Sequence, residues 1–350
     1  MGVNSQGSAP RSAHDTDTRV ADLEDRGSAP GASERRGPDD RPAALRGVHT
    51  IMPTPFTPDG RLDEESVASL VRFLVAAGVD GVTVLGFLGE AHKLSEAEQE
   101  VVVSVAVQAA GGRVPVVAGA SAGGVKVSVE RALRFVELGA AGLMVAPVAS
   151  DEAAVLAQYR ELDEALAAGG GRLPVVVHDY PASTGVRVSP ATLASLHTEV
   201  PSVTTVKLED PPTGAKLSAL KRLAPGLAVL GGLGGLHLVE ELARGAAGVM
   251  TGVSFPELLV GAVRGSSAGD EARRRASAEY RKAAAFLAFE FQPGVGLAVR
   301  KEVYRRRGAI RHALVRAPGA QLDEETAREL TEHLDHLHAV RPDLAAVPSA

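Results

Sequence analysis

Residues 202–214 read SVTTVKLEDPPTG, a β-branched run that ends on a lysine and is followed by a Pro-Pro turn. β-Branched residues favour strands, so Val203–Val206 predicts a strand, and the period-two alternation of strand side chains places Thr205, Lys207 and Glu209 on one face. The chain has seven lysines, and the other six lie in segments typical of loops or solvated helix faces. Lys207 is therefore the lysine that requires a functional explanation.

Short Val-rich runs of this kind recur along the chain after Val48, with helical periodicity between them. The runs cover residues 48–52, 81–86, 114–119, 142–146, 174–178, 203–207, 227–231 and 248–251. Between them, acidic first turns such as those after Asp63 and Ser95 are typical of helix starts. Near-continuous apolar strands that alternate with helices predict an α/β protein with a parallel sheet, here a closed (β/α)₈ TIM barrel. No G-x-G-x-x-G motif follows the first run, which disfavours a dinucleotide-binding fold.

The chain divides into three predicted parts. Residues 1–46 contain no aromatic residue and are rich in Arg, Asp, Gly, Ser, Ala and Pro, a composition that predicts a disordered tail that is dispensable for folding. Residues 47–265 hold the predicted barrel. Residues 266–345 predict a C-terminal helical extension, because three segments there carry an apolar helical face, 271–291, 296–307 and 322–338.

The bulk composition disfavours several classes of protein. The net charge is −6 and the arginines are interleaved with acids, so nucleic acid is not an expected partner, and the basic run Arg305–Arg307 is expected on a solvated helix face. The chain has no cysteine, so a reducing, cytoplasmic location is expected. No apolar run approaches the ~20 residues that span a bilayer, so no membrane contact is expected. His333, His336 and His338 lie close together in the sequence, but a polar helix face is the favoured interpretation and no metal is expected.

Polar residues follow several of the predicted strands, where the active sites of such barrels lie. Lys207 ends the sixth run and His178 ends the fifth. Burial lowers the pKa of a lysine and leaves neutral amine that can attack a carbonyl, which is Schiff-base chemistry; an ion pair of Lys207 with Glu209, Asp210 or Glu90 is the structural alternative. His178 can serve as a general acid and base or as a hydrogen-bonded structural residue, and both interpretations stay open.

Three motifs together resemble one family. They are G-x-x-G-E at residues 86–90, HDYPASTG at residues 178–185 and VTTVKLED at residues 203–210. In this order and spacing, the chain resembles the dihydrodipicolinate synthase / N-acetylneuraminate lyase family from about Val48 into the helical extension. The resemblance implies a (β/α)₈ barrel that forms a homo-oligomer, a dimer or a tetramer. It also implies class I aldolase chemistry in which Lys207 forms an imine with pyruvate or another 2-oxo acid, with no cofactor besides this covalent imine.

The sequence departs from the family pattern at several places. Phe87 and Leu88 stand where the family has two hydroxyl residues that hold the 2-oxo acid carboxylate and relay protons. His178 stands where the family has its catalytic tyrosine, and Ser183 where dihydrodipicolinate synthases have the arginine that recognises the second substrate. The segment APVAS, residues 146–150, lacks the tyrosine expected after the fourth strand. The nucleophile of the family is thus retained and its relay is not.

The residues and the resemblance together predict a Schiff-base-forming lyase or aldolase whose substrate is a small 2-oxo acid or aldehyde. Lys207 is the expected nucleophile, and His178 or Tyr180 is the expected proton-transfer residue. The expected substrate-binding residues are Gly86, Phe87, Leu88, Gly89, Glu90, Ser183, Glu209, Gly231 and Met250. The alternatives are 4-hydroxy-tetrahydrodipicolinate synthase itself, a non-catalytic ligand-binding relative, and a barrel enzyme of another class in which Gly231–Gly235 binds phosphate instead of forming a tight turn.

Overall fold

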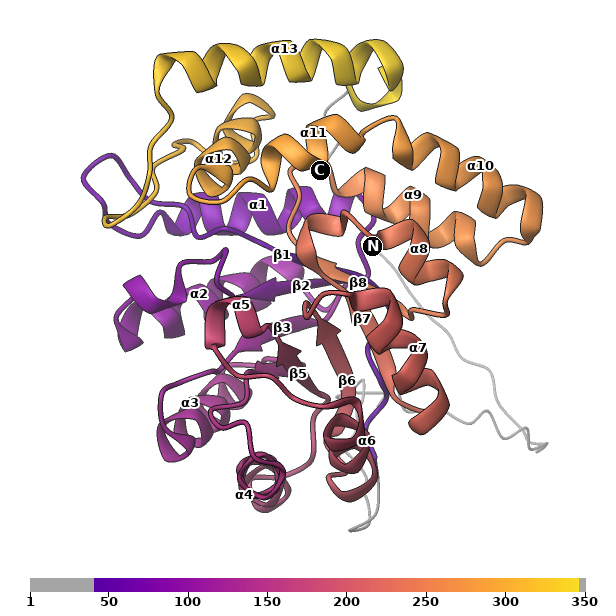
Figure 1. Cartoon of the computed structure of the whole chain (residues 1–350). Helices are drawn as coiled ribbons and strands as arrows, with labels where there is room; N and C mark the ends of the chain where they lie inside the picture. Colours follow the sequence, from indigo (N-terminus) through magenta and orange to yellow (C-terminus); the bar gives the residue numbers. More distant parts are fainter. Residues whose placement is uncertain (1–40, 346–350) are drawn as a thin grey trace, which may run out of the picture. The chain divides into compact units, whose positions relative to one another are not determined.

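The computed structural model describes residues 41–345 and confirms the TIM barrel (Figure 1). Eight parallel strands in this part of the chain close in sequence order, and the last strand pairs with the first. The strands are β1 Gly47–Ile51, β2 Gly81–Val84, β3 Val116–Gly119, β4 Gly142–Val145, β5 Val175–Asp179, β6 Val203–Leu208, β7 Ala228–Gly231 and β8 Gly248–Thr251. Each strand overlaps one of the predicted runs, so the Val-rich pattern located the whole sheet.

Helices follow the strands around the barrel. They are α1 Glu64–Ala76, α2 Glu96–Ala110, α3 Val125–Glu137, α4 Glu152–Ala168, α5 Pro181–Thr184, α6 Pro190–Glu199, α7 Thr213–Leu223, α8 Leu238–Ala243 and α9 Pro256–Ser266, with short 3₁₀ turns η1 Ala91–Lys93 and η2 Leu233–Gly235. Two helices begin at the predicted signals. Asp63 caps α1 by accepting a hydrogen bond from the Ser66 N–H, and Ser95 and Glu98 form a capping box at α2.

The alternation of strand side chains divides the apolar residues into two cores. The larger core lies between strands and helices and includes Val206 and Leu208 of β6. The smaller core, which we call the lumen cluster, fills the barrel with Leu45, Ile51, Val117, Met144, Val176, Leu230 and Met250. Lys207 lies between Val206 and Leu208 in the strand and therefore points to the opposite side, into the lumen, as the alternation predicts.

The C-terminal helical extension is confirmed, with one helix divided in two. Its elements are α10 Asp270–Arg281, α11 Ala284–Glu290, α12 Gly296–Arg306, α13 Glu324–Val340 and the 3₁₀ turn η3 Pro342–Ala345. The segment predicted as one helix over 271–291 breaks between α10 and α11. The two halves have different partners, since α10 packs along α9 whereas α11 packs on η2, α12 and α13. Tertiary contacts thus override a continuous helical pattern.

The predicted tail falls largely outside the described residues. Residues 1–40 lie outside them, but residues 41–46 contact the barrel. Arg41 donates a hydrogen bond to the carbonyl of Val203 at 3.0 Å, and the Leu45 N–H donates one to Thr205 Oγ1 at 3.1 Å. The Leu45 side chain belongs to the lumen cluster and closes the lumen at the end where β1 begins. The folded unit therefore includes a few residues that the composition assigned to the tail.

The basic run and the hydropathy of the helices differ in how well they match the expectations from composition. The basic run Arg305–Arg307 is only partly a solvated face, because Arg307 is 7% exposed and donates hydrogen bonds to the Ser254 carbonyl and to Glu257. Its guanidinium also lies 4.3 Å from the centroid of the Phe255 ring. Within residues 41–345, no helix is long and apolar enough to cross a bilayer.

Candidate active site

Lys207 and His178 lie side by side in the barrel lumen. In the ladder between β5 and β6, His178 is the direct partner of Lys207. Both are buried, with 2% exposure for His178 and 4% for Lys207. Glu209 follows on the same face of the chain as Lys207 and is also buried. We call Lys207, His178 and Glu209 the lumen triad.

The polar atoms of the lumen triad form a triangle. Lys207 Nζ lies 2.5 Å from Glu209 Oε2 and 2.9 Å from His178 Nε2. His178 Nε2 lies 2.8 Å from the same carboxylate oxygen. The other oxygen, Glu209 Oε1, accepts a hydrogen bond from the Leu233 N–H at 2.7 Å. Because both of its oxygens are engaged, the Glu209 carboxylate is fixed in position beside the lysine.

Burial governs the protonation of the lumen triad. Burial, and then the charge of Lys207, lower the pKa of His178 to about 4. Burial also lowers the pKa of Lys207, although Glu209 opposes this effect. Burial disfavours the charge of Glu209, but the Lys207 ammonium and the hydrogen bond with His178 outweigh it and lower the pKa of Glu209 to about 2. Near neutral pH, Glu209 is therefore an anion and His178 a neutral imidazole.

The triangle allows one proton to pass from Lys207 to His178. In the tautomer that carries its proton on Nδ1, the neutral imidazole of His178 accepts a hydrogen bond from Lys207 at Nε2, and the imidazolium donates one from Nε2 to Glu209. Transfer from the Lys207 ammonium to Nε2 gives a neutral amine and an imidazolium that Glu209 stabilises, with no change in the net charge of the triad. A neutral amine is the form of lysine that attacks a carbonyl carbon.

Phe87 and Tyr180 form an aromatic wall beside the lumen triad. The Tyr180 ring stacks on His178 with centroids 5.6 Å apart and planes 20° apart. The Phe87 ring lies 5.7 Å from His178 and 5.9 Å from Tyr180. Phe87 is 43% exposed, whereas Leu88 packs on the lumen cluster. The two residues that replace the hydroxyl pair of the family pattern therefore give this mouth of the barrel an apolar lining.

The glycine-rich loop after β7 holds Glu209. Its Leu233 N–H donates to Glu209, and its Gly234 N–H donates to Thr251 Oγ1 at 3.0 Å. Phosphate binding by Gly231–Gly235 would require free amides that point to the ligand. Because these two amides are already paired within the protein, the arrangement favours the tight turn over the phosphate site.

Two carboxylates fill the space beside the first two glycines of this loop. A Cβ atom on Gly232 would overlap Glu209, and one on Gly231 would overlap Glu241 of α8. Glu241 is 2% exposed, and its Oε1 accepts a hydrogen bond from Thr213 Oγ1 at 2.6 Å. Burial raises the pKa of Glu241 to about 7. No sequence motif marks Glu241 as a site residue, and the glycines at 231 and 232 are the one sequence signal that points to a closely approaching side chain.

Backbone strain is concentrated around the lumen triad. Among residues 41–345, positive φ values at non-glycine residues occur at Leu85 (59°), Glu90 (54°) and Leu233 (47°). Leu85 and Glu90 lie in the loop after β2, which carries Phe87, and Leu233 lies in the loop after β7, which holds Glu209. Each such residue costs about 1–3 kcal/mol and persists only where its surroundings enforce it. This distribution is typical of a functional site.

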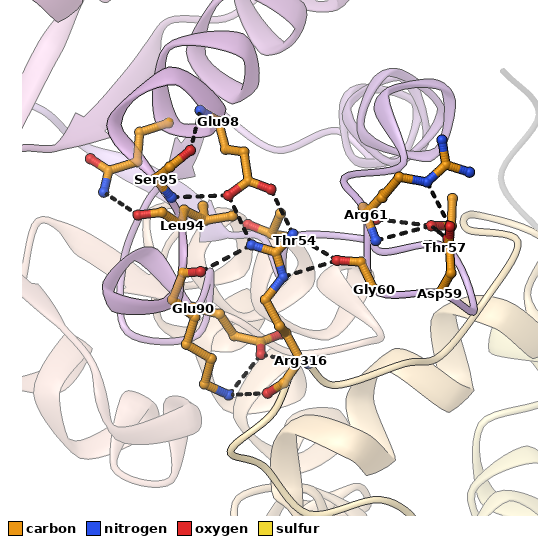
Figure 2. A network of polar contacts seen from close by, with 12 residues as sticks. Thr54, Thr57, Asp59, Gly60, Arg61, Glu90, Leu94, Ser95, Glu98 and Arg316 are labelled. Carbon is orange, nitrogen blue, oxygen red and sulfur yellow. Dashed lines mark hydrogen bonds and ion pairs between the residues drawn. The ribbon is translucent and has the colours of Figure 1, made fainter.

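Glu90 anchors the loop after β2 to the C-terminal part of the chain. Its carboxylate accepts hydrogen bonds from Lys301 Nζ at 2.5 Å, Lys93 Nζ at 2.8 Å and the Arg316 N–H at 3.0 Å. The Arg316 guanidinium in turn binds the Glu98 carboxylate and the backbone of the neighbouring loops (Figure 2). We call Glu90, Lys93, Lys301 and Arg316 the Glu90 anchor. Its contacts place Glu90 as a support of the loop that carries Phe87.

The expectation that the six other lysines lie in loops or on solvated helix faces is wrong for two of them. Lys301 of α12 is 0% exposed. Lys216 of α7 is 9% exposed and pairs with Asp179 at 2.6 Å and Asp210 at 3.1 Å. Helical periodicity does not reveal these lysines as buried, because their acidic partners come from other elements. Asp210, one of the alternative partners considered for Lys207, is engaged by Lys216 instead.

The remaining predicted binding residues lie on β8, in the loop after β2 and on α5. Met250 is 0% exposed and belongs to the lumen cluster. Gly86 and Gly89 form the loop after β2, in which the Gly89 N–H donates to the Gly86 carbonyl at 3.0 Å. Ser183 is exposed on the short helix α5. Their roles in substrate binding stay predictions.

The C-terminal histidines belong to the helical extension. His333 stacks on Phe289 with centroids 4.2 Å apart, and His338 meets Phe255 edge to face at 6.0 Å. Within residues 41–345, no group of three or more His, Asp or Glu side chains is arranged to hold a metal ion.

Comparison with known proteins places this site in a family. Residues 44–337 match the Dihydrodipicolinate synthetase family. The 4-hydroxy-tetrahydrodipicolinate synthase of Stenotrophomonas maltophilia (strain K279a) is 37% identical over 192 residues, which are 54% of this chain and 63% of that protein. The L-2-keto-3-deoxyarabonate dehydratase of Azospirillum brasilense is 34% identical over 221 residues, 61% of this chain and 69% of that protein. The chain thus matches less than two thirds of the synthase and slightly more than two thirds of the dehydratase.

A solved structure supports the same assignment. Dihydrodipicolinate synthase from Rhodopseudomonas palustris superposes with a TM-score of 0.79 and 34% sequence identity, covering 85% of this chain and 100% of that chain. The family match extends over most of the chain, from just before β1 into α13. On this agreement of sequence and fold, the chain belongs to the Dihydrodipicolinate synthetase family.

Proposed function

We propose that the chain is a class I lyase in which Lys207 forms an imine with a small carbonyl substrate, an aldehyde or a 2-oxo acid. The lumen triad carries this proposal. A buried lysine with a lowered pKa lies 2.9 Å from a neutral imidazole and 2.5 Å from a fixed carboxylate. A lysine that served only in an ion pair would not need a base within hydrogen-bond distance.

Imine formation requires proton transfers that His178 is placed to perform. The ammonium of Lys207 first gives one proton to His178 Nε2, and the amine lone pair then forms the C–N bond while the carbonyl π electrons move to oxygen. A second proton passes from nitrogen to oxygen, and the imidazolium gives the first proton to the same oxygen. The oxygen leaves as water, and the nitrogen lone pair forms the C=N bond. The third ammonium proton stays on the iminium nitrogen.

The geometry supports His178 over Tyr180 as the proton carrier. His178 Nε2 is within hydrogen-bond distance of Lys207 Nζ, whereas the Tyr180 ring centroid lies 5.9 Å from Nζ and its face stacks on the imidazole. Because the Tyr180 ring stacks on the imidazole of His178, Tyr180 can hold that imidazole in its orientation. A positioned acid and base contributes about 10²- to 10⁴-fold in rate. We therefore expect His178→Phe to cost more activity than Tyr180→Phe.

The imine at Lys207 can lead to more than one lyase reaction. The relatives are named as synthases and a dehydratase, so cleavage or formation of either a C–C or a C–O bond is compatible with the family. We disfavour 4-hydroxy-tetrahydrodipicolinate synthesis itself. Phe87 and Leu88 line the mouth with apolar groups, and Ser183 is short and exposed on α5.

We also propose that the chain acts as a homo-oligomer in the cytoplasm, on the family resemblance and the absence of cysteine. Sedimentation velocity of the purified chain tests the assembly. A monomer across the micromolar range would contradict it.

Borohydride trapping tests the imine. The chain is incubated with a panel of aldehydes and 2-oxo acids, reduced, digested and analysed by mass spectrometry. We expect an adduct on Lys207, and none in Lys207→Ala or in Lys207→Arg, since guanidinium stays protonated. Lys126→Ala is the control, because this side chain is 85% exposed. An adduct that persists in folded Lys207→Ala would move the imine to another lysine and contradict the role of Lys207. No adduct from any probe with the unaltered chain would favour the non-catalytic alternative.

A further inference from the structure

We infer that the aromatic wall of Phe87 and Tyr180 is a binding subsite for the far end of a 2-oxo acid, and that this end is an uncharged aryl or alkyl group. The inference rests on the proposed imine at Lys207 and narrows its substrate class. The carbonyl and its carboxylate, which we call the head, are those of any 2-oxo acid. The new element is the group carried beyond the third carbon.

The loop after β2 can accommodate the head. Its Phe87 ring lies 5.7 Å from the ring of His178, so the loop borders the lumen triad. Within residues 41–345, the N–H groups of Phe87 and Leu88 have no hydrogen-bond acceptor. Successive N–H groups of a turn form a concave site for an anion. These two groups can therefore hold the carboxylate at the loop where the family resemblance places it.

The far end of the substrate must extend toward the mouth. The interior of the barrel is filled by the lumen cluster, in which Val176, Leu230 and Met250 are fully buried. Such close packing leaves no room for an added chain without strain. A substituent on the imine carbon at Lys207 therefore points outward and passes the aromatic wall.

The aromatic wall lies within reach of such a substituent. The centroid of the Tyr180 ring is 5.9 Å from Lys207 Nζ, and the Phe87 ring is 5.9 Å from the Tyr180 ring. The fourth carbon of an imine-bound 2-oxo acid is three bonds from Nζ, so it lies at most about 3.8 Å away. A group attached to that carbon therefore meets the two rings.

The exposure of Phe87 indicates that its ring is there to be covered. Phe87 is 43% exposed and is the most exposed phenylalanine of residues 41–345. Its loop is held in a strained form, with Leu85 and Glu90 at positive φ, and the Glu90 anchor fixes it in place. An apolar group that covers the ring removes both surfaces from water, which favours binding.

The cations around the mouth already have partners within the protein. In the described part of the chain, the segments between each strand and the next of the helices α1, α2, α3, α4, α6, α7, α8 and α9 contain only three lysines or arginines. Each pairs with an acid: Arg61 with Asp59 at 2.6 Å, Lys93 with Glu90 at 2.8 Å and Arg187 with Asp210 at 2.5 Å. A second carboxylate at the far end would lose hydration against the rings without gaining a free cation. The far end is therefore uncharged.

The size of the preference follows from the contacts between rings. A contact between two aromatic rings contributes about 2- to 12-fold in binding beyond the burial of its area. The removal of the Phe87 ring and of the substrate ring from water adds to this. A phenyl group at the far end should therefore be favoured by at least about 10-fold over a substrate that ends at the third carbon.

The test compares three 2-oxo acids that share the head and differ in the far end. They are pyruvate, 2-oxo-4-phenylbutanoate and 2-oxopentanedioate. Each is titrated against the chain with cyanoborohydride, and mass spectrometry gives the concentration that half-saturates labelling of Lys207. The ratios between probes are divided by the ratios for imine formation with a free lysine derivative, which removes differences in intrinsic reactivity.

The ratios are measured in the unaltered chain and in three variants. Phe87→Ser removes the ring from an exposed position, and Phe87→Tyr keeps it. Leu223→Ala is the matched control, because it removes an apolar side chain that is 56% exposed on α7. Sedimentation velocity of each variant reports any change in assembly.

We expect 2-oxo-4-phenylbutanoate to half-saturate labelling at a concentration at least about 10-fold below that of pyruvate, and 2-oxopentanedioate to bind no more tightly than pyruvate. Phe87→Ser should reduce the preference for the phenyl probe to within about threefold, and Phe87→Tyr and Leu223→Ala should keep it.

Equal binding of pyruvate and the phenyl probe in the unaltered chain, or a preference that Phe87→Ser leaves unchanged, would overturn the inference and leave the imine intact. Tighter labelling by 2-oxopentanedioate would overturn it too, because it would reveal a cation at the far end. If Phe87→Ser dissociates an assembly and leaves the preference unchanged, the ring belongs to an interface between copies of the chain and the inference is wrong. If none of the three probes labels Lys207, the proposed function fails and the inference falls with it.

Discussion

The protonation of His178 depends on the charge of Lys207, and replacing Lys207 with Met tests this dependence. Met keeps an unbranched apolar side chain and removes the ammonium. In the unaltered chain, burial and the Lys207 charge lower the pKa of His178, and Glu209 raises it. Without Lys207, the buried Glu209 lies 2.8 Å from Nε2 and has lost its cation. We therefore expect the pKa of His178 to rise in Lys207→Met and to fall below its native value of about 4 in Glu209→Gln.

The magnitude follows from the distance between the two groups. Unit charges 2.9 Å apart interact by about 6 kcal/mol at an effective dielectric constant of about 20, equivalent to about 4 pKa units. This is an upper limit, because the pKa of Lys207 is itself lowered and its charge is partly lost. Half of this shift would bring the pKa of His178 to about 6. At pH 5.5 the imidazole would then be about three-quarters protonated, against about 3% in the unaltered chain.

Nuclear magnetic resonance of chain labelled with ¹⁵N at the imidazole ring measures this directly. The chain has ten histidines, so the His178 signals are assigned by their loss in His178→Phe. Lys126→Met is the control for loss of a lysine on the surface, and circular dichroism checks the fold of each variant. A pKa of His178 that stays within about half a unit in Lys207→Met, or that rises in Glu209→Gln, would refute the assigned charges of the triad.

Three further outcomes are expected. Lys301→Met leaves the buried Glu90 carboxylate short of one cation, so the free energy of unfolding in urea should fall by about 3 kcal/mol, and the double variant with Glu90→Gln should recover part of that loss. Gly232→Ala pushes a methyl group against the triad and should slow borohydride trapping at least 10-fold, whereas Gly123→Ala, with open space around it, should not; equal rates would show that the loop yields. The pKa of Glu241 is raised to about 7 from an unfolded value near 4.5, so the folded chain holds a proton that the unfolded chain has lost, and stability should fall by at most about 3 kcal/mol as pH rises from 4.5 to 7. Denaturation across that range should show the slope in the unaltered chain and lack it in Glu241→Gln.

The sequence predicts those features that depend on neighbouring residues or on a repeated pattern. The strands follow from the Val-rich runs, and the caps at Asp63 and Ser95 follow from side chains three residues before their partners. The contact between His178 and Lys207 follows as well, because both residues lie near the ends of adjacent parallel strands and point into the lumen. Because adjacent parallel strands end at the same edge of the sheet, two residues that are each predicted at a strand end are also predicted to lie next to each other.

Other features depend on contacts between distant segments and could not be predicted in this way. Lys301 pairs with Glu90 across 211 positions of sequence, and a lysine on an amphipathic helix gives no sign of a buried partner. The break between α10 and α11 has no glycine or proline to mark it, since it arises from the different elements on which the two helices pack. The expectation that Arg307 lies on a solvated helix face is wrong for the same reason. Its carbonyl and carboxylate partners come from the segment before α9 and from α9 itself.

The Glu90 anchor has a consequence for engineering by exchange of segments. Hydrogen bonds join the loop that carries Phe87 to α12 and to Arg316. The barrel and the helical extension must therefore come from the same parent protein when segments are exchanged between relatives. A chimera that takes its first four strands from one parent and its last helices from another must carry an acid at position 90 together with both cations that meet it. Libraries aimed at new substrates should therefore vary residues 87 and 88 while leaving the anchor intact, because that support lets the mouth accept new side chains without losing its shape.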